Sequence, residues 1–137
     1  KSIGMTPRTF QKLETVGYHA AAGLVANGAA ALAAIGQELL VRSGVPKADT
    51  VKMLGPLLRS VAENVEALGF PDALTGPVRR GDAQGIEKQL KILNARLPEA
   101  VPLFIESARA QLPLAIALKD ASKSAFADVR RVLDESN

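Results

Sequence analysis

The chain has 137 residues, the size of one ordinary domain, with 47% hydrophobic and 23% charged residues, which is a globular rather than a disordered balance. It has no cysteine and a single histidine, His19, which excludes disulfides and thiolate chemistry and argues against a metal site. The formal charge of +3 comes without a basic block, and only 4% of the residues are aromatic, so we expect no nucleic-acid partner.

The first predicted helix is unusually long. Thr6–Pro7 provides a capping hydroxyl followed by proline, and Ser43–Gly44 provides a glycine stop. A break near Gly17 is compatible with the pattern. The stretch Ala20–Gly36 carries no charge and consists mostly of Ala and Gly around Asn27, so its composition and length favour a buried central helix over a membrane span. We therefore expect no membrane partner.

The second predicted helix runs from Pro46 to Gly69. Gly55–Pro56 lies inside it and predicts a kink or a short break, because proline lacks the amide that the helix needs. Apolar residues recur at spacings of three or four and form one stripe. The stripe consists of Val51, Leu54, Leu58, Val61, Val65 and Leu68.

Three more helices complete the chain. The third begins at Asp82, an N-cap residue by type, and the fourth spans Pro98–Leu118, where Pro113 should kink or divide it. The fifth spans about Asp120–Asp134. With no alternating strand pattern and no repeat, the chain is predicted to be all-α. The expected inward residues are Ile86, Leu90, Leu93, Leu97, Phe104, Ile105, Ala108, Leu112, Phe126, Val129 and Leu133.

The segment Phe70–Asp82 is predicted to be a stiff loop, because it holds two prolines and two glycines. It would display Thr75, Arg79 and Arg80 at the start of the third helix, where exposed amides and arginine suit a carboxylate or phosphate. The alternative is a structural connection in which Asp82 caps the helix and the arginines are solvated.

A second polar feature lies on the first helix. His19, Gly23 and Asn27 are spaced by four residues and form a slowly drifting row on one side. His19 can exchange a proton near neutral pH, Asn27 can donate and accept hydrogen bonds, and Gly23 would leave room for a substrate. The alternative is a core histidine and asparagine satisfied by neighbouring loops, with Gly23 serving helix packing.

Two motifs carry a family resemblance. The run Tyr18–Ala22 followed by Asn27, and the later run Leu74–Asp82, resemble an uncharacterised helical domain of bacterial proteins with the features of oxidoreductases. In that family the domain follows an N-terminal Rossmann domain. Its fold is similar to the C-terminal domain of 6-phosphogluconate dehydrogenase, of the β-hydroxyacid dehydrogenases and of the ketopantoate reductases. The similarity extends from about Tyr18 to Leu93.

The resemblance implies a single helical substrate and dimerisation domain over residues 1–137, with one long Ala/Gly-rich central helix. The parent would bind NAD or NADP in a Rossmann domain that this chain lacks, since the chain has no Gly-x-Gly-x-x-Gly after a strand, and this fragment alone would bind neither. Gly23 stands where relatives of known chemistry often have lysine, and Gln89 where closer members tend to have histidine. His19 is then the remaining proton-donor candidate.

Three functional hypotheses follow. In the first, the chain belongs to a cytoplasmic, homodimeric NAD(P)-dependent oxidoreductase acting on a small molecule, with His19 as acid/base, Asn27 orienting the substrate, Gly23 leaving space for it, and Thr75 with Arg80 binding an anionic or carbonyl group. In the second, it is a non-catalytic helical dimerisation or partner-binding module. A regulatory small-ligand domain is the third.

Overall fold

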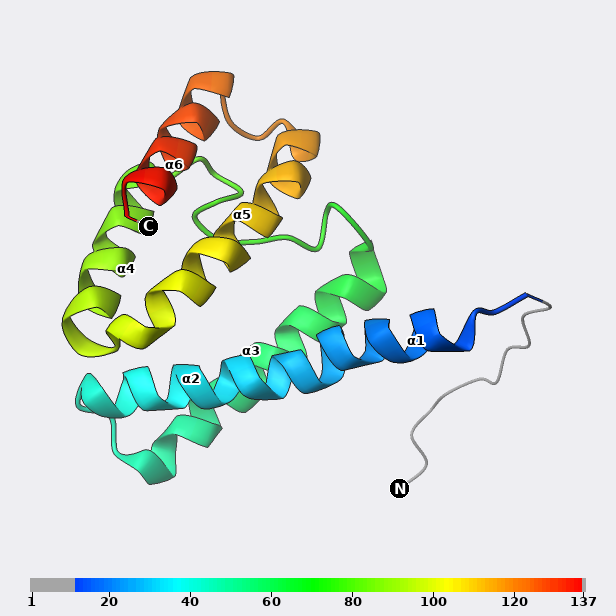
Figure 1. The fold of residues 1–137 in the computed structure, drawn as a ribbon, viewed down its shortest axis with the longest axis horizontal. Coiled ribbons are helices and arrows are strands. Elements are labelled where there is room, and N and C mark those ends of the chain that lie inside the picture. The colour runs from blue at the N-terminus through cyan, green and yellow to red at the C-terminus, as the bar shows by residue number, and fades with distance from the viewer. Residues whose placement is uncertain (1–11, 137) are drawn as a thin grey trace. The chain divides into compact units, whose positions relative to one another are not determined.

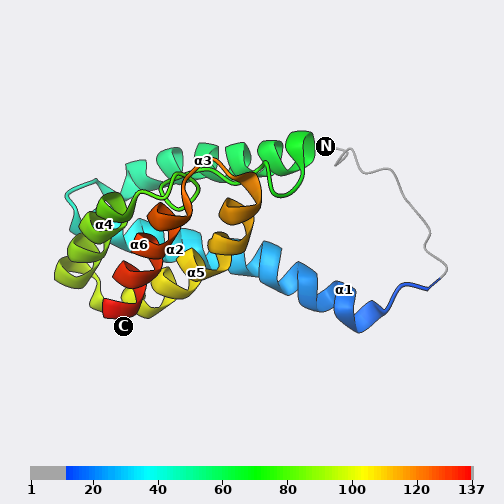
Figure 2. The same ribbon diagram turned by 90° about the horizontal axis from the view of Figure 1, so that it is seen from above.

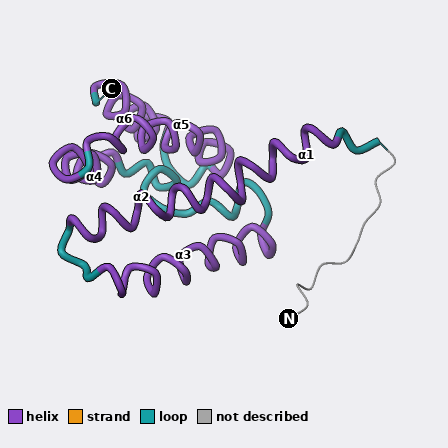
Figure 3. Tube along the Cα trace, turned by 60° about the horizontal axis from the view of Figure 1, so that its bottom comes forward, coloured by secondary structure: helices purple, strands orange, loops and turns teal. Residues whose placement is uncertain are grey.

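The computed structural model describes residues 12–136, and this part of the chain contains helices and loops but no strand (Figure 3). The all-α prediction is therefore confirmed. The chain divides into two compact units, Lys1–Leu32 and Ala33–Asn137, and each is described by itself. The helices are α1 (Thr15–Ala22), the π-helix η1 (Gly23–Asn27), α2 (Gly28–Arg42), α3 (Lys47–Leu68), α4 (Ala83–Arg96), the 3₁₀ turn η2 (Pro98–Ala100), α5 (Val101–Leu118) and α6 (Lys123–Glu135).

The long first helix begins later than the sequence suggests. The expected start at Thr6–Pro7 lies outside the described residues, and the described helix begins at Thr15, because the Glu14 carboxylate accepts a hydrogen bond of 2.7 Å from the amide of Gly17. From there α1, η1 and α2 follow one another without a gap. The predicted glycine stop is confirmed: Gly44 has φ +99°, and the amides of Gly44 and Val45 bond back into the last turn as in a Schellman motif.

The prediction that this helix is buried is wrong. No residue of α1, η1 or α2 is buried, although the span Thr15–Arg42 is apolar enough to cross a membrane by length and composition alone, as is Pro98–Leu118. Alanine and glycine present little apolar surface per residue, so leaving them exposed costs little free energy. Any burial of α1, η1 and α2 would therefore need a further surface packed against them, because none of their residues is buried in the described structure.

The hydrophobic core lies among α4, α5 and α6, which stand side by side in Figures 1 and 2. The inward positions expected from the spacing are confirmed, except that Phe104 is only half-buried. Ile86, Leu133 and Val129 have no exposed surface. The C-terminal half of α2 packs on this core through Ile35 and Leu39. The second unit is thus a three-helix core with one helix laid against it.

Two expected helix breaks are absent. Pro56 lies within α3 and Pro113 within α5, and both helices continue through them. In α5, the buried side chains of Ala108, Leu112 and Ala115 hold the helix on both sides of the proline, and this packing offsets the cost of a lost backbone hydrogen bond, about 3 kcal/mol. The last helix also begins slightly later than expected, after Ser122, whose hydroxyl accepts the amide of Ala125.

Helix α3 has the predicted bounds but not the burial that its stripe suggests. Its only buried residue is Thr50, whose hydroxyl donates to the carbonyl of Lys47 and accepts from Gln37 on α2 at 2.7 Å. Of the stripe residues, Leu54 alone is partly buried, against Gly36 of α2. The stripe is present on the helix, but it does not face the core.

Candidate functional site

The row of polar residues on the first helix is exposed to solvent. His19 lies in α1, while Gly23 and Asn27 begin and end the π-helix η1. His19 and Asn27 are exposed and Gly23 is partly buried. The alternative of a core histidine and asparagine is therefore wrong for this structure, because neither side chain is enclosed.

The π-helix changes how these residues line up. Four residues of α-helix overshoot a full turn by about 40°, so His19, Gly23 and Asn27 would drift steadily around a regular helix. In η1 the amide of Gly28 bonds to the carbonyl of Gly23, five residues earlier, and such a turn rotates less per residue. From His19 to Gly23 the chain therefore rotates slightly more than one full turn, and from Gly23 to Asn27 it rotates slightly less than one. Asn27 returns to the face that carries His19, roughly 12 Å along the axis at 1.5 Å per residue.

The surroundings of His19 leave its ring available. The imidazole lies edge-on to Tyr18, with ring centroids 5.6 Å apart and planes at 62°. Within residues 12–136 no hydrogen bond or ion pair engages either ring nitrogen. A π turn of this kind is an uncommon device that is often retained at functional sites. The row can present one proton-transfer group and one amide to a molecule lying along the helix.

The second set of polar residues lies on the loop between α3 and α4, and the structure separates its two arginines. Arg79 donates at 2.7 Å to Asp120, and its other nitrogen donates to the backbone carbonyls of Asp72 and Leu74 at 3.1 and 2.7 Å. Arg79 is therefore a structural tie rather than a displayed cation, which corrects the expectation that it is on display. Arg80 and Thr75 are exposed as expected. Over the described chain, the Arg80 guanidinium has no hydrogen-bond or salt-bridge partner.

The end of the loop is fixed by a glycine and an aspartate. Gly81 has φ +64°, and a Cβ added there would lie 2.7 Å from the Cβ of Ala125 and 3.2 Å from that of Ala121. Only glycine allows the loop to approach α6 this closely. Asp82 caps α4 by accepting the amide of Gly85 at 2.8 Å, as predicted. A carboxylate of the chain already satisfies this amide, so Arg80 and Thr75 remain as the groups for an external anion.

The five predicted site residues fall into two sets. His19, Gly23 and Asn27 lie in the first unit, and Thr75 and Arg80 lie in the second. The first three residues share one continuous helical segment, and the last two share the loop between α3 and α4. No group of three or more metal-binding side chains occurs among the residues it describes.

One cluster near the core was not anticipated from the sequence. The guanidinium of Arg42, at the end of α2, donates to the carbonyl of Arg96 at 2.8 Å, and Arg96 at the end of α4 donates to the carbonyl of Arg42. Each arginine thus satisfies the carbonyl end of the other helix. A hydrogen bond to Glu38, with Glu99 nearby, raises the pKa of Arg42 above its usual value. Its role is to join α2 to the core.

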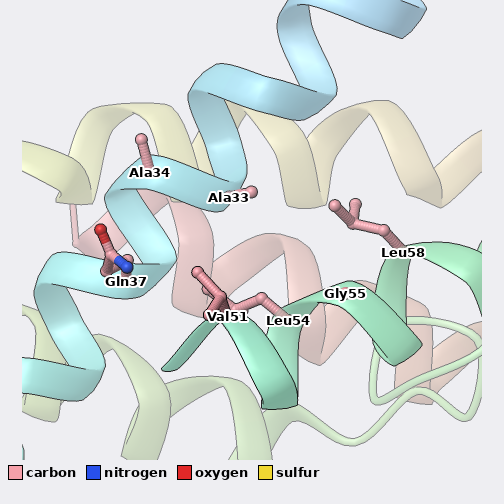
Figure 4. Close-up of a pocket in the computed structure, with 7 residues that line it drawn as sticks. All are labelled: Ala33, Ala34, Gln37, Val51, Leu54, Gly55 and Leu58. Carbon is pink, nitrogen blue, oxygen red and sulfur yellow. The ribbon is translucent and has the colours of Figure 1, made fainter. Parts of the chain in front are cut away.

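An apolar groove between α2 and α3 was also not anticipated. It has a volume of about 280 Å³, and Figure 4 shows Ala33 and Gln37 of α2 across from side chains of α3. Apart from the Gln37 amide, which donates to Thr50, the groove offers little hydrogen bonding. Its lining residues are Ala33, Ala34, Gln37, Val51, Leu54, Gly55 and Leu58. A groove of this composition suits an apolar side chain better than a polar substrate.

No curated protein and no solved structure gave a match to this chain. One family model does match, over residues 1–112, a span that ends within α5 and takes in all five predicted site residues. The chain belongs to the family described as Domain of unknown function (DUF2520).

Proposed function

We propose that this chain is the substrate-binding and dimerisation domain of a cytoplasmic NAD(P)-dependent oxidoreductase, and that a Rossmann domain precedes it in the intact protein. The basis is the resemblance of the segments Tyr18–Asn27 and Leu74–Asp82 to the helical domain of such enzymes. The observation that carries the proposal is the contrast between two neighbouring arginines: three hydrogen bonds hold Arg79, whereas Arg80 extends from the same rigid loop with no partner in the described residues. A fixed loop that presents an unpaired arginine suits recognition of an anionic group.

The residues of this chain do not fit a dinucleotide themselves. A dinucleotide site needs a strand, a glycine-rich turn and a helix N-terminus, and the described residues contain no strand. The nicotinamide cofactor would supply the hydride from the Rossmann domain. In the second unit, Arg80 and Thr75 would bind an anionic or carbonyl group. In the first unit, Asn27 would orient a substrate beside Gly23, and the His19 imidazole would donate or accept a proton.

The test uses the intact protein. Oxidation of NADH and NADPH is followed by absorbance with small 2-keto and 3-keto acids as substrates, and the variant Arg80→Ala is compared with the wild type. Loss of a charged hydrogen bond, about 1.5–3 kcal/mol, predicts a tenfold to hundredfold lower kcat/KM with an unchanged melting temperature. The control is Arg131→Ala, since Arg131 pairs with Asp128 and Glu135 on the exposed side of α6. Equal turnover by the wild type and Arg80→Ala would contradict the assigned role.

A non-catalytic helical module is the second candidate, and one observation favours it. The face of α3 is apolar and exposed, as in proteins whose surface is completed by a partner. This candidate predicts that the intact protein turns over neither nucleotide with any acid tested, and that substitutions at Arg80 and Asn27 leave its association state unchanged.

A further inference from the structure

Helix α3 exposes most of its large apolar side chains. Leu57 and Val51 are each 61% exposed and Val61 is 52% exposed, whereas the core helices bury the corresponding residues. Large exposed apolar patches mark interaction sites, and this one extends along a helix of 22 residues. We therefore expect a partner to cover it. We call this surface the α3 face. It consists of Val51, Met53, Leu54, Leu57, Leu58, Val61, Val65 and Leu68.

The charges beside this face indicate what covers it. Arg59 and Glu66 each follow a stripe residue by one position, Leu58 and Val65, so both lie about 100° round the helix on the same side of the stripe. They are seven residues apart, which is close to two turns. Paired head to tail, two α3 helices set Arg59 of each copy level with Glu66 of the other. Paired in parallel about a two-fold axis, the two copies would carry these residues on opposite flanks of the seam, so Arg59 of one copy would not meet Glu66 of the other.

We propose that a second copy of this chain covers the α3 face, with the two α3 helices antiparallel and a two-fold axis between Ala62 and Glu63. The interface is isologous, so each favourable contact occurs twice. It contains two Arg59–Glu66 pairs on one flank, where Gly55 and Ala62 allow close approach. This inference rests on the homodimer part of the proposed function and not on its redox part.

The same register accounts for the groove between α2 and α3. It sets Leu68, the last residue of the second copy's α3, level with Leu57, so that the end of that helix points toward Gly55, which lines the groove. Phe70 follows the cap residue Gly69 at this end and is 68% exposed. A cavity of about 150 Å³ is enough to hold benzene, and this groove has about 280 Å³. Each copy therefore inserts one phenyl ring into the groove of the other, the kind of buried aromatic contact that dominates interface energies.

The first test measures the dimer dissociation constant of the purified chain by analytical ultracentrifugation over roughly 0.1 to 100 μM. Arg59→Glu and Glu66→Arg each replace two attractions by two repulsions, so each should weaken the dimer about tenfold or more, and the double exchange should restore it. Glu63→Arg makes the same charge change as Glu66→Arg on the side of α3 away from the stripe. It should leave the dissociation constant unchanged.

The second variant addresses the groove. Phe70→Ala should raise the dissociation constant roughly thirtyfold or more, whereas Phe70→Leu should raise it much less. Far-UV circular dichroism of each variant should match the wild type, because Phe70 is mostly exposed in the single chain. Failure of Phe70→Ala to weaken the dimer would overturn the groove contact.

Orientation is tested with spin labels, which attach at single sites because the chain has no cysteine. In the proposed register, residue 54 of one copy lies 17 positions from residue 54 of the other, about 25 Å along the axis at 1.5 Å per residue, and residue 65 lies only 5 positions from its mate. Leu54→Cys should therefore give a much longer distance than Val65→Cys. Equal short distances would mean parallel helices and overturn the proposal.

A wild-type chain that stays monomeric at the highest concentration would also overturn it. These outcomes are separable from failure of the proposed function. A monomer that turns over NADPH contradicts only this interface, and an α3-paired dimer without turnover contradicts only the redox assignment.

Discussion

Replacing Arg79 by alanine should destabilise the second unit, while the same change at Arg80 should not. Arg79 donates three hydrogen bonds, to Asp120 and to the carbonyls of Asp72 and Leu74, and together they close the loop onto the end of α5. Each contributes a net 0.5–1.5 kcal/mol, and the exposure of Asp120 places its share toward the lower end, so the loss should be about 1.5–3 kcal/mol. In a chain of this length, that lowers the melting temperature by roughly 5–10 °C.

The assay is thermal unfolding of the isolated chain, followed by far-UV circular dichroism. Arg80→Ala is the matched control and should change the melting temperature by less than about 2 °C, since an exposed side chain without partners changes stability little. Arg79→Lys should give an intermediate loss, because lysine keeps the charge but cannot reach several acceptors as a planar fork. Equal melting temperatures for Arg79→Ala and Arg80→Ala would refute the division of roles on which the anion site depends.

Three further outcomes follow from the same structure. Ile86→Ala should cost about 2–5 kcal/mol in denaturant unfolding, against under 1 kcal/mol for Ile92→Ala on the exposed side of α4, and similar values would place the core wrongly. Asn27→Ala in the intact protein should lower turnover while helix content is kept, and unaltered turnover would rule out its role beside His19. Asp82→Ala should lower the free energy of unfolding by about 1 kcal/mol, because the cap on the Gly85 amide is lost. A fall in kcat/KM at a temperature where the variant stays folded would mean instead that Asp82 contacts substrate.

Sequence periodicity predicted the core well because α4, α5 and α6 find their partners within the chain. The apolar spacing that places Ile86 and Leu133 in the core is a local signal, and the cap at Asp82 is equally local. Helix α3 has the same spacing, yet its stripe is exposed. Apolar periodicity indicates that one face of a helix favours burial, but it does not indicate which part of the chain or which partner covers that face. The long first helix was expected to be buried because of its uncharged Ala/Gly composition, which likewise does not specify what covers it.

The site residues were predictable by type but not by arrangement. Nothing in the residue types distinguishes Arg79 from Arg80, since the difference arises from Asp120, 41 residues away from Arg79 in the chain. The π-helix has only a faint signal, the five-residue spacing of Gly23 and Gly28, and it changes the alignment of His19 with Asn27. The prolines of α3 and α5 were expected to interrupt their helices, and tertiary packing or solvation of the freed carbonyls overrode that local preference.

The central claim is that the displayed Arg80 binds the anionic group of the proposed enzyme's substrate. A crystal structure of the intact protein with NADP⁺ bound tests this most directly. We expect the Arg80 guanidinium to face the cleft beside the nicotinamide ring, close enough to contact a small anionic molecule there. A structure in which Arg80 faces away from that cleft would contradict it.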